Sequence, residues 1–445
     1  MRRTQMPLFA PETEWVAPHE LKDLSGVKEV AIDLETNDPE LMTLGSGNVI
    51  GRGHIAGVAV AIEGWSGYYP IGHEGGGNMD RKLVLEWVQD LVNQEKTTFI
   101  FHNAMYDVCW LRQAGIKIRG KIVDTMIAAS LIDENRMSYQ LNTLAKHYVG
   151  IGKDEKVLQE AAKSYSVNPK SEMYKLPAMY VGEYAERDAE ATLKLWQRLS
   201  TELVSQELMD VFNLETKLFP CLVDMRFKGV RVDLEHAAKL KKNLIVRENK
   251  ILSKIKELTG IHVEIHAARS IAKAFDKLKL PYDRTEKSNE PSFTKNFLQN
   301  HPHELARSIA DAREINKAHT TFIDSITKHS AKGRIHADIN QIRSDQGGTV
   351  TGRFSMSNPN LQQIPARHPE IGPMIRSIFI PEEKTVWGSF DYSQQEPRIL
   401  VHYAKLQNLD GVDEIVNAYN EGDADFHQVV ADMAGIERKQ AKTIN

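Results

Sequence analysis

Short apolar strands alternate with amphipathic helices over residues 1–200, and few folds accommodate that order. The strand patterns cover 28–35, 55–62, 68–71 and 97–101, and the helical patterns cover about 81–93, 104–114 and 123–133. This alternation predicts an α/β domain in which helices pack on a sheet. Beyond it, residues 182–225 and 233–330 are mostly helical, and strand patterns return at 334–342 and 385–392.

Two carboxylates stand at the end of the first predicted strand. Asp33 and Glu35 are two residues apart, so both side chains point to one face of the strand and could bind one metal ion. Taken alone the pair says little, because 60 acidic residues in 445 give about eight such pairs by chance. The pair gains meaning only from acidic residues elsewhere in the chain.

Other segments supply those residues. Asp107 lies in a helix that opens directly after a short strand, and Tyr184 and Asp188 are neighbours on one face of a later helix. Four carboxylates provide the hard oxygen ligands that two divalent cations need to activate water and stabilise a leaving alkoxide. The tyrosine hydroxyl can orient the attacking water.

These residues carry a resemblance. IDLET, HNAMYD and EYAERD, in this order, resemble the three motifs of 3′–5′ proofreading exonucleases, whose domain is ribonuclease H-like. The resemblance implies a site with Mg²⁺ or Mn²⁺ that acts on single-stranded DNA 3′ ends. It implies that Asp33, Glu35, Asp107 and Asp188 are the metal ligands and that Tyr184 positions the water. Asp124, in VDTMIAASLI, matches a further acidic position.

A second resemblance lies downstream. TGRFSMSNPNLQQIP and SFDYSQQEPRIL resemble the palm of family A DNA polymerases, and LETKLFPCLVDMRFKGVRVD resembles the start of their thumb. The likeness to this family covers the chain from residue 28 onward. It implies an exonuclease domain at 1–200, a helical thumb at 201–333, and the first part of the palm and fingers at 334–445.

The polymerase resemblance also implies roles for single residues. Asp391 would hold the catalytic cations, and Glu396 would act as a steric gate against a ribose 2′-OH. Arg353, Asn360 and Gln362 would contact the primer-template along its minor groove and backbone, where base-pair shape rather than sequence is read.

Three further residues match the part of the fingers that meets the incoming dNTP. These are His427, Arg438 and Lys442. Arg438 and Lys442 are four apart on one predicted helix face, which would aim two cations at a polyphosphate. Pro397 departs from the family pattern, near the start of a helix, where proline is tolerated.

The family's later fingers residues and its His-Asp-Glu motif have no counterpart in these 445 residues, and no 5′-nuclease domain precedes residue 33. We therefore expect an incomplete polymerase site in this chain and no templated nucleotide addition by the chain alone. We also expect a C-terminal polymerase fragment as a partner.

Composition sets broader limits. The net charge is −4, yet residues 221–340 hold 23 Lys and Arg against 15 Asp and Glu, and Lys239, Lys241 and Lys242 cluster there. A basic middle favours phosphate contact by the predicted thumb. No apolar run approaches the ~20 residues of a membrane span. Cys109 and Cys221 lie in apolar helical contexts, which predicts buried thiols and a reducing cytoplasm, that of a bacterial or phage-infected cell.

Two other functions fit part of the pattern. A stand-alone 3′–5′ exonuclease acting on RNA would share the same carboxylates, but it would have no use for TGRFS and DYSQQE. A non-catalytic DNA-binding subunit would have no use for the complete set of nuclease residues. The leading hypothesis is a phage-like family A polymerase with a proofreading exonuclease.

Overall fold

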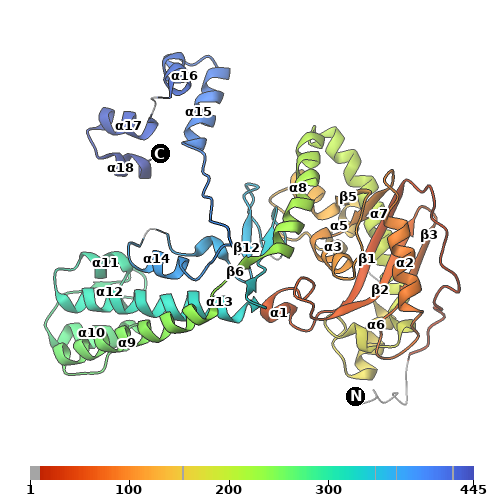
Figure 1. Cartoon of the computed structure of the whole chain (residues 1–445), viewed down its shortest axis with the longest axis horizontal. Helices are drawn as coiled ribbons and strands as arrows, with labels where there is room; N and C mark the ends of the chain where they lie inside the picture. Colours follow the sequence, from red (N-terminus) through yellow and green to blue (C-terminus); the bar gives the residue numbers. More distant parts are fainter. Residues whose placement is uncertain (1–10, 153–154, 346, 367, 423–424, 445) are drawn as a thin grey trace. The chain divides into compact units, whose positions relative to one another are not determined.

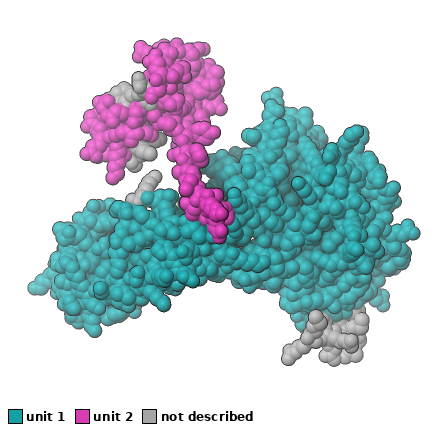
Figure 2. Space-filling view, viewed as in Figure 1, with its two compact units in different colours: residues 1–380 teal, residues 381–445 magenta. Residues whose placement is uncertain are grey.

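The computed structural model of the chain describes residues 11–152, 155–345, 347–366, 368–422 and 425–444. The chain divides into two compact units, Met1–Ile380 and Pro381–Asn445, which Figure 2 draws in different colours. Each unit is described by itself. Among the described residues, none of the helices is both long and apolar enough to cross a membrane.

A five-stranded sheet forms the centre of the N-terminal half of the first unit (Figure 1). Its spatial order is β3-β2-β1-β4-β5. The strands are β1 (Glu29–Asn37), β2 (His54–Ile62), β3 (Trp65–Pro70), β4 (Thr98–Phe101) and β5 (Lys121–Asp124). The central strand β1 is antiparallel to β2 and parallel to β4, which is parallel to β5. The carboxyl ends of β1, β4 and β5 therefore meet at one edge.

Helices cover both faces of this sheet. One face packs against α4 (Thr125–Ile132), α5 (Leu141–Val149), α6 (Lys156–Tyr165) and α7 (Gly182–Ser205), and the other against α2 (Arg81–Val92) and α3 (Ala104–Gln113). The two apolar cores follow the strand alternation, because Ala31 belongs to the first core and Ile32 to the second. Asp33 and Glu35, two and four residues after Ala31, thus face the side of α7. The shorter elements here are α1 (Leu41–Leu44) and the 3-10 turns η1 (Met173–Lys175) and η2 (Ala178–Tyr180).

The predicted thumb is built from long helices. After α8 (Met209–Lys228), helix α9 (Leu234–Thr259) packs along α12 (Glu304–Lys317) (Figure 1). Asp233 caps α9 by accepting a hydrogen bond from the backbone N–H of His236 at 2.8 Å. The remaining elements are α10 (Ala268–Lys277), β7 (Asp283–Arg284), β8 (Pro291–Ser292), α11 (Lys295–Asn300), the π-helical turn η3 (Ala318–Ile323) and α13 (Asp324–Lys328).

Short strands join the thumb to the segment that follows. A three-stranded sheet has the order β6-β10-β9, and a separate hairpin pairs β11 with β12. These elements are β6 (Val230–Arg231), β9 (Ser330–Ala331), β10 (Arg334–Ile335), β11 (Asp338–Asn340) and β12 (Ser355–Ser357), followed by the 3-10 turn η4 (Leu361–Gln363) and α14 (Ile371–Arg376).

The second unit is helical in its described part. Its helices are α15 (Gln395–Leu406), α16 (Val412–Glu421), α17 (Phe426–Ala434) and α18 (Arg438–Ile444). Val401, Val412 and Tyr419 form a small core, and the Arg398 guanidinium lies 4.5 Å from the centre of the Tyr419 ring.

The structure corrects three expectations and confirms that residues 182–225 are mostly helical, as the two helices α7 and α8. The predicted helix at 123–133 begins only at Thr125, since Lys121–Asp124 pairs with β4 as an edge strand. The strand predicted at 385–392 is irregular chain, because the described residues of this unit contain no strand to pair with it. Cys109 is buried as expected, but Cys221 lies on the solvent side of α8.

Candidate functional site

The first pair of predicted ligands lies on the central strand. Asp33 and Glu35 are half-buried residues of β1, and Asp33 stands opposite Ala59 of β2. The pairing register shifts after Glu35, so a local irregularity ends the regular ladder there. Such irregularities re-aim side chains beside active sites. Both carboxylates stay on the face that α7 covers.

Asp107 joins this pair from the first turn of α3. Its side chain is only 4% exposed, and its Oδ1 accepts a hydrogen bond from the backbone N–H of Leu34 at 3.1 Å. Burial, and next the charge of Asp33, raise the pKa of Asp107 well above its usual range. Asp33 and Asp107 are therefore close enough to repel each other across the strand-to-helix junction.

Helix α7 brings the remaining two residues. Asp188 is buried, and the Tyr184 hydroxyl is hydrogen-bonded to it. Burial, followed by the charges of Asp188, Glu35 and Asp33, raises the pKa of Tyr184 well above 10. Because three carboxylates affect its pKa, Tyr184 lies close to all three of them. The structure thus brings together residues that lie up to 155 positions apart in the sequence.

Asp124 has a different position in the structure. Its two carboxylate oxygens accept hydrogen bonds from the backbone N–H groups of Asn103, Ala104 and Met126, at 3.0, 2.7 and 2.8 Å. Burial nevertheless raises its pKa to about 6. Asp124 therefore ties the N-termini of α3 and α4 together and fixes the helix that carries Asp107.

A cleft of about 550 Å³ opens beside these residues. Glu35 and Tyr184 line it, and its polar walls include His102, Gln140, Asn142, Gln159, Lys170 and Asp345. A cleft of this size accommodates a nucleotide. Its polar lining suits a ligand rich in hydrogen-bonding groups.

The carboxylates provide the hard oxygen donors that Mg²⁺ and Mn²⁺ prefer. Among the described residues, no three His, Cys, Asp or Glu side chains are placed to ligate one cation together. The carboxylates are nevertheless close neighbours, because Asp33 raises the pKa of Asp107, and Asp188, Glu35 and Asp33 raise that of Tyr184. The complete ligand set of Asp33, Glu35, Asp107 and Asp188 stays a prediction.

Sequence reasoning missed a buried pair behind the site. The Tyr68 hydroxyl lies 2.7 Å from His73 Nε2, and His73 Nδ1 lies 3.0 Å from the carbonyl oxygen of Leu176. A carbonyl only accepts, so Nδ1 carries the proton and Nε2 accepts from Tyr68. Burial lowers the pKa of His73 to about 4. No motif contained this pair, which becomes visible only when β3 lies beside the loop after α6.

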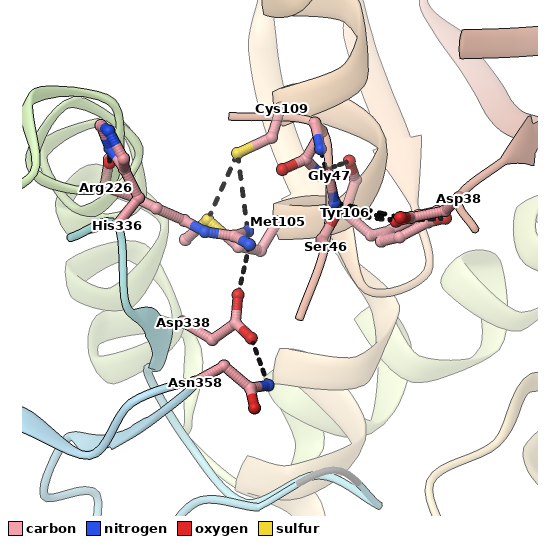
Figure 3. A network of polar contacts seen from close by, with 11 residues as sticks. Asp38, Ser46, Gly47, Met105, Tyr106, Cys109, Arg226, His336, Asp338 and Asn358 are labelled. Atoms are coloured by element: carbon pink, nitrogen blue, oxygen red, sulfur yellow. Dashed lines mark hydrogen bonds and ion pairs between the residues drawn. The ribbon is translucent and has the colours of Figure 1, made fainter. Parts of the chain in front are cut away.

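A polar network connects this half of the unit to the segment that follows the thumb (Figure 3). The Arg226 guanidinium of α8 is 4% exposed and forms an ion pair with Asp338 of β11. Asp338 also accepts a hydrogen bond from Asn358 Nδ2 at 2.9 Å. The carbonyl oxygen of Arg226 accepts from His336 Nδ1 at 2.8 Å. Arg226 Nη1 also donates to Cys109 Sγ of α3 at 3.9 Å. The network therefore links a helix of the nuclease half to residues of the polymerase resemblance.

The predicted DNA-contacting residues lie in the loop and turn around β12. Arg353 and Gln362 are exposed, and Gln362 Nε2 donates to the carbonyl oxygen of Phe354 at 3.0 Å. Asn360 caps η4, because its Oδ1 accepts from the backbone N–H of Gln362 at 3.0 Å. Arg353 and Gln362 thus present their side chains at the surface, whereas Asn360 shapes the turn between them.

The predicted lysine cluster is only partly available for phosphates. Lys241 Nζ forms an ion pair with Asp324 Oδ1 at 2.5 Å, whereas Lys239 and Lys242 are exposed on α9. Two of the three predicted lysines therefore present their charge to solvent.

The second unit holds the predicted palm and fingers residues. Asp391 lies in irregular chain rather than at a strand end, and Glu396 lies in the first turn of α15. His427 lies in the first turn of α17, and Arg438 Nε forms an ion pair with Asp425 Oδ2 at 2.6 Å. Lys442 belongs to α18, but its side chain lies outside the described residues. These assignments stay predictions.

Comparison with known proteins decides the family. The model of DNA polymerase family A matches residues 234–445, and that of a 3′–5′ exonuclease matches residues 16–204. A DNA-directed DNA polymerase of Pseudomonas phage M6 is 37% identical over 100% of this chain and 70% of its own length. This chain belongs to DNA polymerase family A.

Other relatives agree with that assignment. DNA polymerase DpoZ of Salmonella phage PMBT28 is 32% identical over 93% of this chain and 67% of its own length. DNA polymerase I of Pseudomonas aeruginosa is 27% identical over 96% of this chain and 46% of its own length. The POL domain of Pol1 from M. smegmatis, solved in complex with DNA primer-template and dNTP, has the same fold, with a TM-score of 0.70 and 21% identity over 94% of this chain and 67% of its own.

These matches confirm the α/β exonuclease domain followed by a polymerase region, and the polymerase is an enzyme with a nuclease domain. Neither a stand-alone exoribonuclease nor a non-catalytic subunit accounts for both family matches. Both families generally depend on divalent metal ions.

Proposed function

We propose that the cleft beside α7 is a 3′–5′ exonuclease site that removes nucleotides from single-stranded DNA 3′ ends. Asp33, Glu35, Asp107 and Asp188 would hold two divalent cations, Mg²⁺ or Mn²⁺. When bound, such cations lower the pKa of a water molecule and stabilise the leaving oxygen. The Tyr184 hydroxyl, whose pKa is raised by burial and by the nearby carboxylates, would orient the attacking water.

The observation that carries this proposal is the electrostatic convergence at the cleft. Besides burial, the charges of Asp188, Glu35 and Asp33 raise the pKa of Tyr184, and the charge of Asp33 raises that of Asp107. Clustered carboxylates cost folding free energy, because each disfavours ionisation of the next. Bound cations would offset that cost, which supports the proposed site.

We propose further that the polymerase region binds primer-template and dNTP. Arg353, Asn360 and Gln362 would contact DNA, and Asp391 would hold the catalytic cations. Glu396, His427, Arg438 and Lys442 would surround the incoming nucleotide. The exposed positions of Arg353 and Gln362 and the shared helix of Arg438 and Lys442 support this assignment. The phage and bacterial origin of its relatives suits action on DNA in the cytoplasm of a bacterial or phage-infected cell.

A C-terminal polymerase segment is the partner that we propose for the second unit. Large apolar side chains are exposed there, including Val386 (88%), Phe390 (97%) and Tyr392 (77%). Exposed apolar surface of this kind marks an interaction site. The relatives from the two phages named above extend beyond the part that this chain matches.

Hydrolysis of 3′-labelled single-stranded DNA in Mg²⁺ tests the nuclease assignment. Asp33→Ala combined with Glu35→Ala should lower the rate by at least about 10³-fold, because it removes two predicted ligands of the catalytic cations. Asp90→Ala combined with Glu95→Ala, two exposed acids outside the cleft, is the matched control and should keep the full rate. Wild-type hydrolysis by the first double variant would overturn the assignment. A parallel arm with labelled RNA decides between DNA and RNA substrates.

A further inference from the structure

A segment of the polymerase region forms part of the nuclease half. Residues 341–345 follow β11 and belong to the sequence that matches the polymerase family. Ile342 is 8% exposed and lies in the same apolar core as the inward-facing side chains of α4, α5 and α7. Gln341 Nε2 donates to the carbonyl oxygen of Glu215 at 2.8 Å. The segment is therefore docked by both apolar and polar contacts.

Two hydrogen bonds extend this docking toward the cleft. The Ser130 hydroxyl of α4 donates to the carbonyl oxygen of Arg343 at 2.7 Å. The backbone N–H of Tyr139 donates to Asp345 Oδ2 at 2.8 Å. Ser130 and Tyr139 are both buried, whereas Asp345 is exposed, so each bond joins a fixed donor of the nuclease half to the docked segment at the edge of the core.

The Tyr139 amide lies at the start of one wall of the cleft. It directly precedes Gln140, Leu141 and Asn142, which all line the cleft. The Tyr139 hydroxyl donates to the carbonyl oxygen of Asp133 at 2.7 Å, which closes the loop upon itself. Asp345 thus holds the end of the loop at Tyr139, directly before the cleft wall begins. Asp345 itself also lines the cleft.

The other end of the segment is anchored as well. Asp338, three residues before Gln341, is held by the buried ion pair with Arg226 of α8 (Figure 3). Asp338 lies in strand β11, which pairs with β12, and β12 begins two residues after Arg353. The segment therefore cannot shift along the nuclease half without breaking a buried ion pair.

We propose that Asp345 is a positioning residue of the nuclease cleft, supplied by the polymerase region, which acts by holding the Tyr139 amide and with it the wall Gln140–Asn142. This inference rests on the proposed exonuclease function. The wall contributes the amide side chains of Gln140 and Asn142, which would hydrogen-bond a terminal nucleotide, so its placement should affect substrate binding more than bond cleavage. Docking of the polymerase region is then a condition for a well-formed nuclease cleft.

Two variants of the full chain separate the roles of this side chain. Asp345→Asn keeps an oxygen that accepts from the Tyr139 amide, whereas Asp345→Ala removes the acceptor. Glu134→Ala, an exposed acid in the same loop, is the matched control. Asp345 is exposed, so neither variant leaves a buried cavity.

The first readout is steady-state hydrolysis of single-stranded DNA in Mg²⁺. Asp345→Ala should raise KM about ten-fold and leave kcat within about two-fold, because losing one hydrogen bond corresponds to roughly that factor. Asp345→Asn and Glu134→Ala should keep the wild-type KM. Equal defects in Asp345→Asn and Asp345→Ala would mean that the charge matters rather than the hydrogen bond, and would overturn the proposal.

The second readout is hydrogen exchange of the backbone amides at Tyr139–Asn142, which requires no activity. Exchange should be faster in Asp345→Ala and unchanged in Asp345→Asn. Unchanged exchange in Asp345→Ala would overturn the positioning role even if KM rose. If the wild-type chain hydrolyses no DNA, the proposed function fails, while the exchange result still decides whether Asp345 orders the wall.

Discussion

The buried ion pair between Arg226 and Asp338 allows an asymmetric prediction (Figure 3). Arg226 is 4% exposed, and the Asp338 side chain is 22% exposed and keeps its hydrogen bond from Asn358. Removing one partner of a buried pair costs about 3–5 kcal/mol, since a charge is left without its partner. Asp338→Ala strands the more buried charge, so its loss of unfolding free energy should lie near the upper end, about 4–5 kcal/mol.

The reciprocal change should cost less. Arg226→Met leaves a carboxylate that still reaches water and Asn358, so we expect about 2–3 kcal/mol. The double variant removes both charges and should be more stable than Asp338→Ala alone. Urea unfolding of all four proteins at one pH, followed by tryptophan fluorescence, measures the cycle. Equal single losses, or a double variant whose loss equals the sum of both, would refute the reasoning.

Three further outcomes follow from single contacts. His73 is buried and its pKa is lowered to about 4, so as pH falls the unfolded chain protonates this histidine at a higher pH than the folded chain does. Stability should fall by about 3 kcal/mol as pH drops from about 6.5 to 4, and His73→Gln should remove that slope in urea titrations. Lys239→Glu combined with Lys242→Glu should reduce the slope of log affinity against log salt concentration for primer-template by about 2. An unchanged slope would mean that these lysines only solvate α9. Gly57→Ala places a Cβ 2.1 Å from the Tyr68 hydroxyl, so its melting temperature should fall, and an unchanged value contradicts the packing.

The elements that carry the predicted nuclease residues were predictable from sequence, because each has a regular local pattern. Asp33 ends a run of alternating apolar residues, and Tyr184 and Asp188 have helical spacing. Such local patterns determine which face a side chain occupies. The parallel pairing of β1 with β4 then brings Asp107 to Asp33, and this pairing follows from the α/β order itself.

Contacts between distant segments could not be predicted in this way. Asp345 lies 206 residues after the Tyr139 amide that it holds, and nothing local to either residue indicates the other. The short strand Lys121–Asp124 was hidden because a strongly apolar helix follows it without a break. The expectation of a strand at 385–392 failed for the opposite reason, since its local pattern favours a strand while pairing depends on a neighbour.

The central claim is that the carboxylates beside α7 form a catalytic metal site, and Asp107→Asn tests it most directly. The asparagine keeps an oxygen for the Leu34 amide and removes only the charge that burial and Asp33 disfavour. With EDTA present, the melting temperature should therefore be equal to or higher than that of the wild type. In Mg²⁺, nucleotide release from 3′-labelled single-stranded DNA should fall by at least about 10³-fold, since a cation ligand is lost. A variant that retains wild-type release would contradict the account, as would one that loses release only because it melts at a lower temperature.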